Sequence, residues 1–347
     1  MERYVAVDNV CAWPALARLP GGDIVAAIHN RPSHAGLAGD VEVWGTEDGG
    51  RFWKLRGVAA AHEPGTNRMN VACGLAANGD LLVLSSGWSN KAENAGEPQP
   101  RPGERPQILP SWACRSSDGG RTWRRGPAMD DAAKQVHPIP FGLVSATADG
   151  QLGASFYESN RCVIAQGEPI RVSAWFCRSK DDGRTWVKAS LIGADAYCET
   201  ATLRVEGGRW LAASRTYPLG RLDLFVSEDD GATWSPRGPL TCDGQHPAHL
   251  LRLADGRVLL TYGVRHSGLF GLGARLSADG GQTWGRPIVI LDFGPSATDG
   301  GYPSSVQLAS GSVLTAYYAN ATDAHTRFHM GVMIWDVDEA DKVNRRK

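Results

Sequence analysis

Six stretches of the chain share one pattern of apolar and polar positions, in which two runs with β-strand alternation flank a polar tip that contains glycine. The tips lie near residues 22, 79, 150, 208, 256 and 311, about 58 residues apart on average. Alternation with a period of two indicates strands, and two such runs around a short glycine-containing tip indicate an antiparallel hairpin. A hairpin that recurs at this spacing is typical of a repeat protein. The six stretches are residues 15–28, 73–86, 142–157, 200–215, 249–263 and 304–318.

A second short element recurs five times, once after each of the first five hairpins. It reads TEDGGRFW at 46–53, SSDGGRTW at 116–123, SKDDGRTW at 179–186, SEDDGATW at 227–234 and SADGGQTW at 277–284. In the shared pattern S/T-x-D-x-G-x-x-W, the hydroxyl and the carboxylate bond the backbone of a turn, glycine supplies a positive φ, and tryptophan fills the space between strands. We therefore interpret the five aspartates as structural: Asp48, Asp118, Asp181, Asp229 and Asp279.

Each of the first five units thus contains a hairpin, a connection and a second hairpin, which together form a four-stranded antiparallel meander. Six such units predict an all-β fold, a six-bladed β-propeller. The sixth unit lacks the second turn and ends with a single strand pattern at 329–337, so we expect the run at 3–9 to supply the missing outer strand and close the ring. We expect residues 1–347 to form one domain, with blades at about 10–55, 66–125, 138–188, 196–236, 245–286 and 301–336.

Composition agrees with this architecture and narrows the range of partners. The 42 glycines and 20 prolines suit many short strands joined by tight turns. The net charge of -1 provides no long-range field toward nucleic acid or an anionic membrane. No stretch reaches the ~18 apolar residues that span a bilayer. These features favour a small neutral or locally anionic ligand.

The cysteines and the amino-terminal residues indicate a compartment. The seven cysteines are odd in number, scattered and without a CxxC pair, which is typical of reduced thiols. The first ten residues, MERYVAVDNV, lack the apolar region of a secretion signal. We therefore expect a cytoplasmic protein.

The meander topology predicts where a site lies. The start of the first strand and the end of the second strand share one end of the sheet. First strands are innermost in a propeller, so residues at these points of all six units converge on a central funnel. Buried polar groups are costly unless partnered, so a polar ring at this place favours a binding site over core filling. The ring consists of Trp13, Asn30, Arg31, Arg68, Asn70, His137, Tyr157, Tyr197, Glu199, Arg215, His246, His249, Arg265, Tyr302, Tyr317 and Tyr318. Of the adjacent Tyr317 and Tyr318, only one can face the funnel.

Structural alternatives remain open for some members of this ring. Glu199 and Arg215 can form an ion pair that only neutralises both charges. His246 and His249, together with His137, can in principle bind zinc, but H-P-x-H on a strand lacks a familiar ligand pattern. We predict neither a metal nor a cofactor.

The five turn motifs and six hairpins resemble the sialidase superfamily over about residues 5–336. Sialidases bind the carboxylate of their substrate with three arginines, and use a tyrosine nucleophile assisted by a glutamate and an aspartate as general acid. By this resemblance, Tyr302 in GGYPSSVQL is the nucleophile and Glu199 in CETATLRV is its partner. Arg215 in LAASRT and Arg265 in LLTYGVR are the matching carboxylate-binding arginines.

The chain also departs from the sialidase pattern. Trp13, in the sequence Ala-Trp-Pro, stands where the first arginine is expected. Arg31 matches a further site arginine, but the aspartate expected about five residues later is absent, and the nearest carboxylate is Asp40. We therefore assign Asp40 as the candidate general acid. Members of the ring that can replace missing groups are Arg68 and His137 for binding, and His246 and His249 for acid–base chemistry.

These features predict an exo-acting glycosidase that hydrolyses a terminal, acidic sugar, because a funnel admits chain ends. Carbohydrate is the expected partner. Two alternatives remain, a non-catalytic carbohydrate-binding or interaction propeller and a polysaccharide lyase on the same fold.

Overall fold

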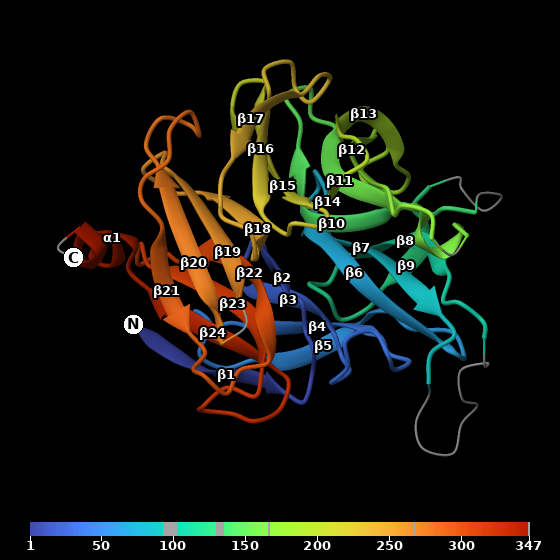
Figure 1. Cartoon of the computed structure of the whole chain (residues 1–347), viewed down its shortest axis with the longest axis horizontal. Coiled ribbons are helices and arrows are strands. Elements are labelled where there is room, and N and C mark those ends of the chain that lie inside the picture. The colour runs from blue at the N-terminus through green and yellow to red at the C-terminus, as the bar shows by residue number, and fades with distance from the viewer. Residues whose placement is uncertain (93–102, 130–134, 166, 267, 346–347) are drawn as a thin grey trace.

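The computed structural model describes residues 1–92, 103–129, 135–165, 167–266 and 268–345. The described residues form twenty-four strands, one turn of 3-10 helix and one α-helix, and Figure 1 shows their arrangement. All six predicted hairpins are present as antiparallel strand pairs. The fold is therefore all-β, as the alternation predicted.

Strands follow one another as four-stranded meanders. The first three are β2 (Ala15–Arg18), β3 (Ile24–His29), β4 (Val41–Thr46) and β5 (Lys54–Ala60); β6 (Thr66–Leu75), β7 (Leu81–Ser89), β8 (Ile108–Ser116) and β9 (Arg124–Pro127); and β10 (Ile139–Ala146), β11 (Leu152–Ser159), β12 (Val172–Ser179) and β13 (Val187–Gly193). The 3-10 helix η1 (Asn160–Cys162) follows β11.

The remaining meanders continue this order around the molecule. They are β14 (Tyr197–Glu206), β15 (Arg209–Thr216), β16 (Leu222–Ser227) and β17 (Ser235–Pro239); β18 (Gln245–Arg252), β19 (Val258–His266), β20 (Leu269–Ser277) and β21 (Ile288–Asp292); and β22 (Asp299–Gln307), β23 (Val313–Asn320) and β24 (His329–Trp335) with β1 (Glu2–Asp8). β1 pairs antiparallel with β24, so the first strand of the chain is the outer strand of the last sheet, as expected.

The prediction of six separate four-stranded blades is wrong for two of the units. Four sheets have four strands, but β6–β9 and β10–β13 form one eight-stranded sheet. The two units join because β10 leaves β11 between Phe141 and Ser145 and pairs there in parallel with β6. Gly74 of β6 permits this approach, since a Cβ at that position would lie 2.2 Å from the carbonyl oxygen of Val144. Alternation along single strands carries no information about this pairing.

The sheets have a propeller-like arrangement around a common centre (Figure 1). β2 contacts β6 and β22, and the contacts continue from β6 to β10, β14, β18 and back to β22. The first strands therefore form a closed inner ring. Apolar clusters lie between consecutive meanders, for example Phe176 of β12 against Trp210 of β15 at 5.0 Å between ring centroids. Burial of apolar surface between neighbouring meanders is thus the main stabilising contribution.

The five turn motifs have the role that their residues predicted. In the third, the hydroxyl of Ser179 donates to Asp181 at 2.8 Å and accepts from the Gly183 amide at 2.8 Å. The Asp181 carboxylate also accepts from the Thr185 amide at 2.8 Å, and the Trp186 indole donates to the Gly183 carbonyl at 3.2 Å. In the fourth, hydrogen bonds lower the pKa of Asp229 to about 2, and the bond from the Thr233 side chain contributes most. These carboxylates accept turn hydrogen bonds as anions.

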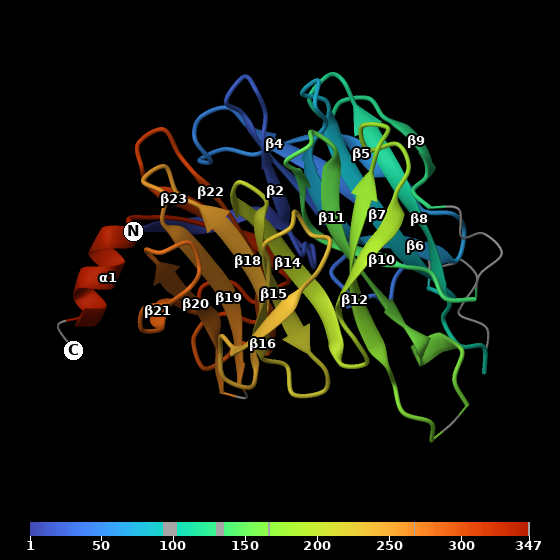
Figure 2. The same ribbon diagram turned by 90° about the horizontal axis from the view of Figure 1, so that it is seen from above.

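The helix α1 (Val337–Arg345) stands at the outer edge of the molecule beside the amino terminus (Figure 2). Asp336 caps it, since the Glu339 amide donates to the Asp336 carboxylate at 2.8 Å. Val337 packs into the apolar cluster between the last two sheets. In the part of the chain that the structure describes, no helix has the length and apolar character needed to cross a bilayer.

Candidate active site

A cavity of about 700 Å³ opens at the end of the ring where first strands begin and second strands end. This is the end that the meander topology predicted. Aromatic and apolar side chains form much of its wall, among them Trp13, Met69, Trp88 and Phe141. Seven members of the predicted polar ring line it: Trp13, Asn70, Tyr157, Glu199, Arg215, His249 and Tyr302.

Bulges in the first strands direct three of these side chains. Asn70 lies between the paired residues Met69 and Val71 and has no partner on β7. Glu199 is likewise skipped in the pairing of β14 with β15, and Tyr302 lies in the register shift between β22 and β23. A bulge rotates the extra residue away from the regular alternation, and bulges commonly re-aim side chains at functional sites. The same device therefore places an amide, a carboxylate and a phenol at one cavity.

Backbone strain coincides with these positions. Trp13, Asn70 and Tyr302 have positive φ values of 45°, 56° and 51°. Residues other than glycine rarely adopt this region, and such strain persists where the surrounding fold imposes it. Three residues with strained backbones line this cavity, which makes it the candidate functional site.

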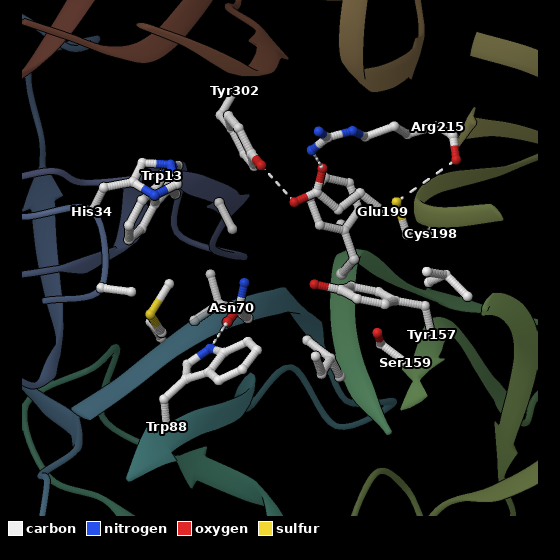
Figure 3. Close-up of a pocket in the computed structure, with 18 of the residues that line it drawn as sticks. Trp13, His34, Asn70, Trp88, Tyr157, Ser159, Cys198, Glu199, Arg215 and Tyr302 are labelled. Carbon is white, nitrogen blue, oxygen red and sulfur yellow. Dashed lines mark hydrogen bonds and ion pairs between the residues drawn. The ribbon is translucent and has the colours of Figure 1, made fainter. Parts of the chain in front are cut away.

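Tyr302, Glu199 and Arg215 form the centre of the site. The phenol of Tyr302 donates to Oε1 of Glu199 at 2.5 Å, and Nη1 of Arg215 donates to Oε2 at 2.6 Å. Figure 3 shows Tyr302 and Arg215 approaching Glu199 from two sides. Tyr302 and Glu199 are 103 residues apart in sequence and come from β22 and β14. The fold thus brings together the nucleophile and base that the sialidase resemblance implied.

Charge and burial set the protonation of this centre. Burial raises the pKa of Glu199, but the charge of Arg215 and the hydrogen bonds from Tyr302 and Arg215 outweigh burial and hold the pKa below its usual value. Burial and the neighbouring Glu199 charge raise the pKa of Tyr302 well above its usual value. The resting site therefore contains an ionised carboxylate that accepts a hydrogen bond from a neutral phenol.

The two histidines predicted for acid–base chemistry are buried and neutral. Burial lowers the pKa of His249 to about 4, and burial followed by the charge of Arg215 lowers the pKa of His246 to about 3. His249 lines the cavity and neither of its ring nitrogens has a hydrogen-bond partner. His246 does not line the cavity and packs against the turn at Gly220. Both imidazoles are therefore neutral near pH 7, and neither is an imidazolium acid.

Asp40, the predicted general acid, lies outside the cavity. Its Oδ1 accepts hydrogen bonds from Nδ1 of His62 at 2.6 Å and from the His62 amide at 2.8 Å. The carboxylate therefore orders the chain between β5 and β6. The sequence placed Asp40 near the site because it is the nearest carboxylate after Arg31, but backbone distance alone did not fix the direction of its side chain.

Three predicted arginines also do not line the cavity. Arg68 is 3% exposed, donates to Glu63 at 3.0 Å and stacks on the Trp112 ring at 3.5 Å. Arg31 donates to the Ala38 carbonyl at 2.9 Å. Arg68 is thus held against β8 by the Trp112 ring, and Arg31 bonds within the connection between β3 and β4, so neither side chain reaches the cavity.

Arg265 lies behind Tyr302 and does not line the cavity. It donates to Asp299 at 2.8 Å and to the Tyr318 hydroxyl at 2.9 Å, and its guanidinium lies 5.8 Å from the centre of the Tyr302 ring. It therefore supports Tyr302 from outside the cavity. His137, at the entry to β10, is buried and does not line the cavity either.

Four lining residues with basic side chains were missed by the sequence reasoning: His34, Lys91, Arg105 and Arg161. His34 lies edge-on to Trp13 at 5.0 Å between ring centroids (Figure 3). Lys91 and Arg161 directly follow β7 and β11, so the topological rule that selects the ends of second strands points to them once the strands are extended by two residues. Among the described residues, the cavity has four cationic side chains, Lys91, Arg105, Arg161 and Arg215, and one carboxylate, Glu199.

The described residues contain no group of three or more His, Cys, Asp or Glu side chains arranged to hold a metal ion. The described residues supply the cavity with three phenols, hydroxyl, amide, imidazole, guanidinium and ammonium groups and one carboxylate. This set suits recognition of an anionic, hydroxyl-rich ligand.

Comparison with known proteins places this fold and site in a family. Residues 22–314 match the BNR repeat-like domain. A sialidase of Micromonospora viridifaciens is 27% identical over 306 residues, which cover 78% of this chain and 44% of that protein, so the chain spans less than half the length of this relative.

Two solved structures share the fold. A protein of unknown function from Dyadobacter fermentans is 24% identical with a TM-score of 0.78, covering 96% of this chain and 97% of that one. The Hadza microbial sialidase Hz136 is 18% identical with a TM-score of 0.70, covering 95% of this chain and 66% of that one. The chain therefore belongs to the BNR-repeat family within the sialidase superfamily.

Proposed function

We propose that this protein is an exo-acting glycoside hydrolase that removes a terminal acidic sugar, with Tyr302 as nucleophile and Glu199 as its base. The observation that carries the proposal is the 2.5 Å hydrogen bond from the Tyr302 phenol to the Glu199 carboxylate inside the cavity. A free phenol is a weak nucleophile near neutral pH, and an adjacent base activates it by taking its proton. The carboxylate that Arg215 keeps ionised is positioned for this step.

The reaction proceeds in two steps that regenerate the site. In the first, the Tyr302 oxygen bonds to the anomeric carbon while its proton passes to Glu199, and the bond from that carbon to the leaving oxygen breaks. In the second, water attacks the anomeric carbon and the bond from that carbon to the Tyr302 oxygen breaks. The phenolate then recovers its proton from Glu199. Two displacements at one carbon retain its configuration. A tyrosine nucleophile also suits an anionic substrate, because a neutral phenol repels it less than a carboxylate does.

A proton donor for the leaving oxygen is still required, and we assign this role to His34. Its imidazole lines the cavity on the side of Trp13, whose ring centroid lies 6.3 Å from that of Tyr302. His34 is exposed, unlike His249, so its ring is accessible to a bound substrate and to water. Histidine is a common general acid, and the neutral ring left after the first step can accept a proton from the attacking water in the second.

The charges of the cavity support an acidic substrate. Four cationic side chains and one carboxylate line it, although the whole chain has a net charge of -1. A local excess of positive charge in a partly enclosed site attracts anions. Trp13 and Trp88 offer apolar faces against which a sugar ring can stack. A cavity of about 700 Å³ is the size of a small-molecule site, which favours the end of a chain over its interior.

A screen of chromogenic glycosides of N-acetylneuraminic acid, uronic acids and neutral sugars tests the proposal. We expect turnover of an acidic glycoside, and a fall in kcat/KM of about 10³-fold or more in Tyr302→Phe and in Glu199→Gln. Tyr317→Phe is the matched control, because Tyr317 stacks on Phe293 outside the cavity. Near-wild-type rates in both site variants, with an unchanged melting temperature, would refute the mechanism.

A second candidate function is a non-catalytic receptor for acidic sugars. It is favoured by the position of Asp40 outside the cavity and by the engagement of Arg265 with Asp299, because both depart from the sialidase pattern. This function predicts ligand binding without turnover of any glycoside in the screen. Calorimetric titration of the same panel distinguishes the two functions.

A further inference from the structure

One part of the cavity wall carries positive charge that no carboxylate of the described residues balances. Lys91 follows β7, Arg105 precedes β8, and Arg161 lies in η1 after β11, and all three line the cavity. Within the described residues, no carboxylate forms an ion pair with any of them. This contrasts with Arg215, whose charge is matched by Glu199 at 2.6 Å. The cavity therefore has one compensated and one uncompensated cationic region.

Lys91 is the strongest indication of a ligand. Lys91 is 8% exposed, and its ammonium lies 5.9 Å from the centre of the Trp88 ring. Burial lowers the pKa of Lys91, which reflects the cost of keeping this charge away from water. A buried ammonium without an anion is unfavourable, and an anion that enters beside it offsets much of that cost.

Arg105 and Arg161 extend this region to the rim of the cavity. Arg161 lies 5.9 Å from the ring of Tyr217, and Arg105 donates to the Ile164 carbonyl at 2.7 Å. Both are exposed, so their remaining N–H groups can reach a ligand. The charges of Lys91, Arg105 and Arg161 all act on the thiol of Cys162, which places the three cations around one point of the wall.

We propose that Lys91, with Arg105 and Arg161, forms a second anion-binding subsite that takes a carboxylate or sulfate on the group attached to the terminal sugar. The position of this anion on a group attached to a terminal sugar rests on the proposed function. The presence of an anion-binding site does not. The substrate class is then a glycan in which the terminal acidic sugar is linked to a second acidic or sulfated residue. The two anions are held by separate parts of one cavity.

Calorimetric titration of the Tyr302→Phe variant tests the subsite without requiring turnover. The probes are glycosides of D-glucuronic acid and N-acetylneuraminic acid with three aglycones, 4-carboxyphenyl, 4-sulfooxyphenyl and the neutral 4-carbamoylphenyl group. A charged hydrogen bond in a partly buried site favours the charged aglycone by about tenfold or more in Kd. The carboxylate and sulfate arms show which anion the subsite prefers.

Substitutions in the same background locate the effect. Lys91→Met keeps the apolar stem and removes the charge, so the preference for anionic aglycones should disappear. Lys54→Met is the matched control, because Lys54 also lies over an aromatic ring, Phe52 at 5.6 Å, but is exposed and outside the cavity. Arg161→Gln, at an exposed position that does not endanger folding, should weaken the preference in part.

Equal affinity for charged and neutral aglycones, absence of binding by all glycosides, or an unchanged preference in Lys91→Met would overturn the inference. A wild-type protein that turns over no glycoside yet shows charge-selective, Lys91-dependent binding would refute the proposed hydrolase and retain the anion subsite. Turnover of a glycoside without any preference for charged aglycones would support the hydrolase and refute the anion subsite.

Discussion

At the scale of single residues, the direction of a side chain matters more than its position in the sequence. Asn70, Glu199 and Tyr302 reach the cavity because each lies at a bulge where the neighbouring strand offers no matching residue. Asp40 and Arg265 lie close to the same end of their sheets, but bonds to His62 and Asp299 turn them elsewhere. The chemistry of the site therefore depends on a few local irregularities of the backbone.

The role assigned to His34 leads to a residue-scale prediction. If His34 protonates the leaving oxygen, His34→Asn should lower kcat/KM by about 10²-fold for a glycoside with a poor leaving group such as methanol. A leaving group such as p-nitrophenol needs little protonation, so its kcat/KM should fall much less. Rates for both glycosides in wild type and variant provide the measurement, with His266→Asn, outside the cavity, as control.

An equal loss for both leaving groups would contradict the proton-donor role of His34. It would instead indicate that His34 acts by positioning Trp13, with which it makes an edge-on contact at 5.0 Å.

At the scale of elements, local rules account for hairpins and turns but not for pairing between units. The turn motif at 179–186 contains all of its own hydrogen-bond partners, because its hydroxyl, carboxylate, glycine and tryptophan form hydrogen bonds within the same eight residues. The parallel pairing of β10 with β6 instead needs a gap in the β10–β11 ladder and a glycine at position 74. This junction lies next to Phe141 and Gly142, which line the cavity, so it also shapes the site.

Gly74→Ala should weaken this junction. The new Cβ would lie 2.2 Å from the carbonyl oxygen of Val144, so the backbone of β6 or β10 must shift. Such overpacking costs about 1–3 kcal/mol in free energy of unfolding. Urea denaturation measures the change, and Gly126→Ala is the control, because a Cβ there meets nothing within 4 Å. Unchanged stability in Gly74→Ala would show that the two strands are not held this closely.

At the scale of the whole molecule, the ring depends on contacts between the ends of the chain. β1 pairs with β24 from Glu2 opposite Ile334 to Asp8 opposite His329. Val7 and Val10 pack in the same apolar cluster as Ile24 and Met330, which joins the first and last sheets. The amino-terminal strand thus helps to hold the sheets around the cavity.

Removal of residues 1–8 should therefore destabilise the entire ring. Each lost backbone hydrogen bond contributes about 1 kcal/mol and the exposed edge of β24 becomes free to pair with other chains. We expect a loss of several kcal/mol in free energy of unfolding, seen as a lower melting temperature and increased aggregation on heating. A synthetic peptide of residues 1–9 added in trans should restore part of the stability. A truncated protein that melts like the full chain would show that closure does not depend on β1.

The sequence by itself determined the elements whose stabilising contacts are short in range. Alternation specified the six hairpins, and each turn motif contained its own hydrogen-bond partners. The repeat order then placed Glu199, Arg215 and Tyr302 at one end of the ring, and resemblance supplied their expected roles. The carbohydrate chemistry proposed for the site rests on the predicted placement and roles of these three residues.

Only the tertiary structure decided which polar residues face the cavity. An arginine or carboxylate near a strand end is equally able to bind a ligand or to pair with a neighbour, and Arg68, Arg265 and Asp40 found partners nearby. Lys91 and Arg161 lie beyond the periodic strands, so alternation carried no information about them. Ion pairs and parallel pairing between β6 and β10 depend on groups brought together in space, which is why the folded chain was needed to settle them.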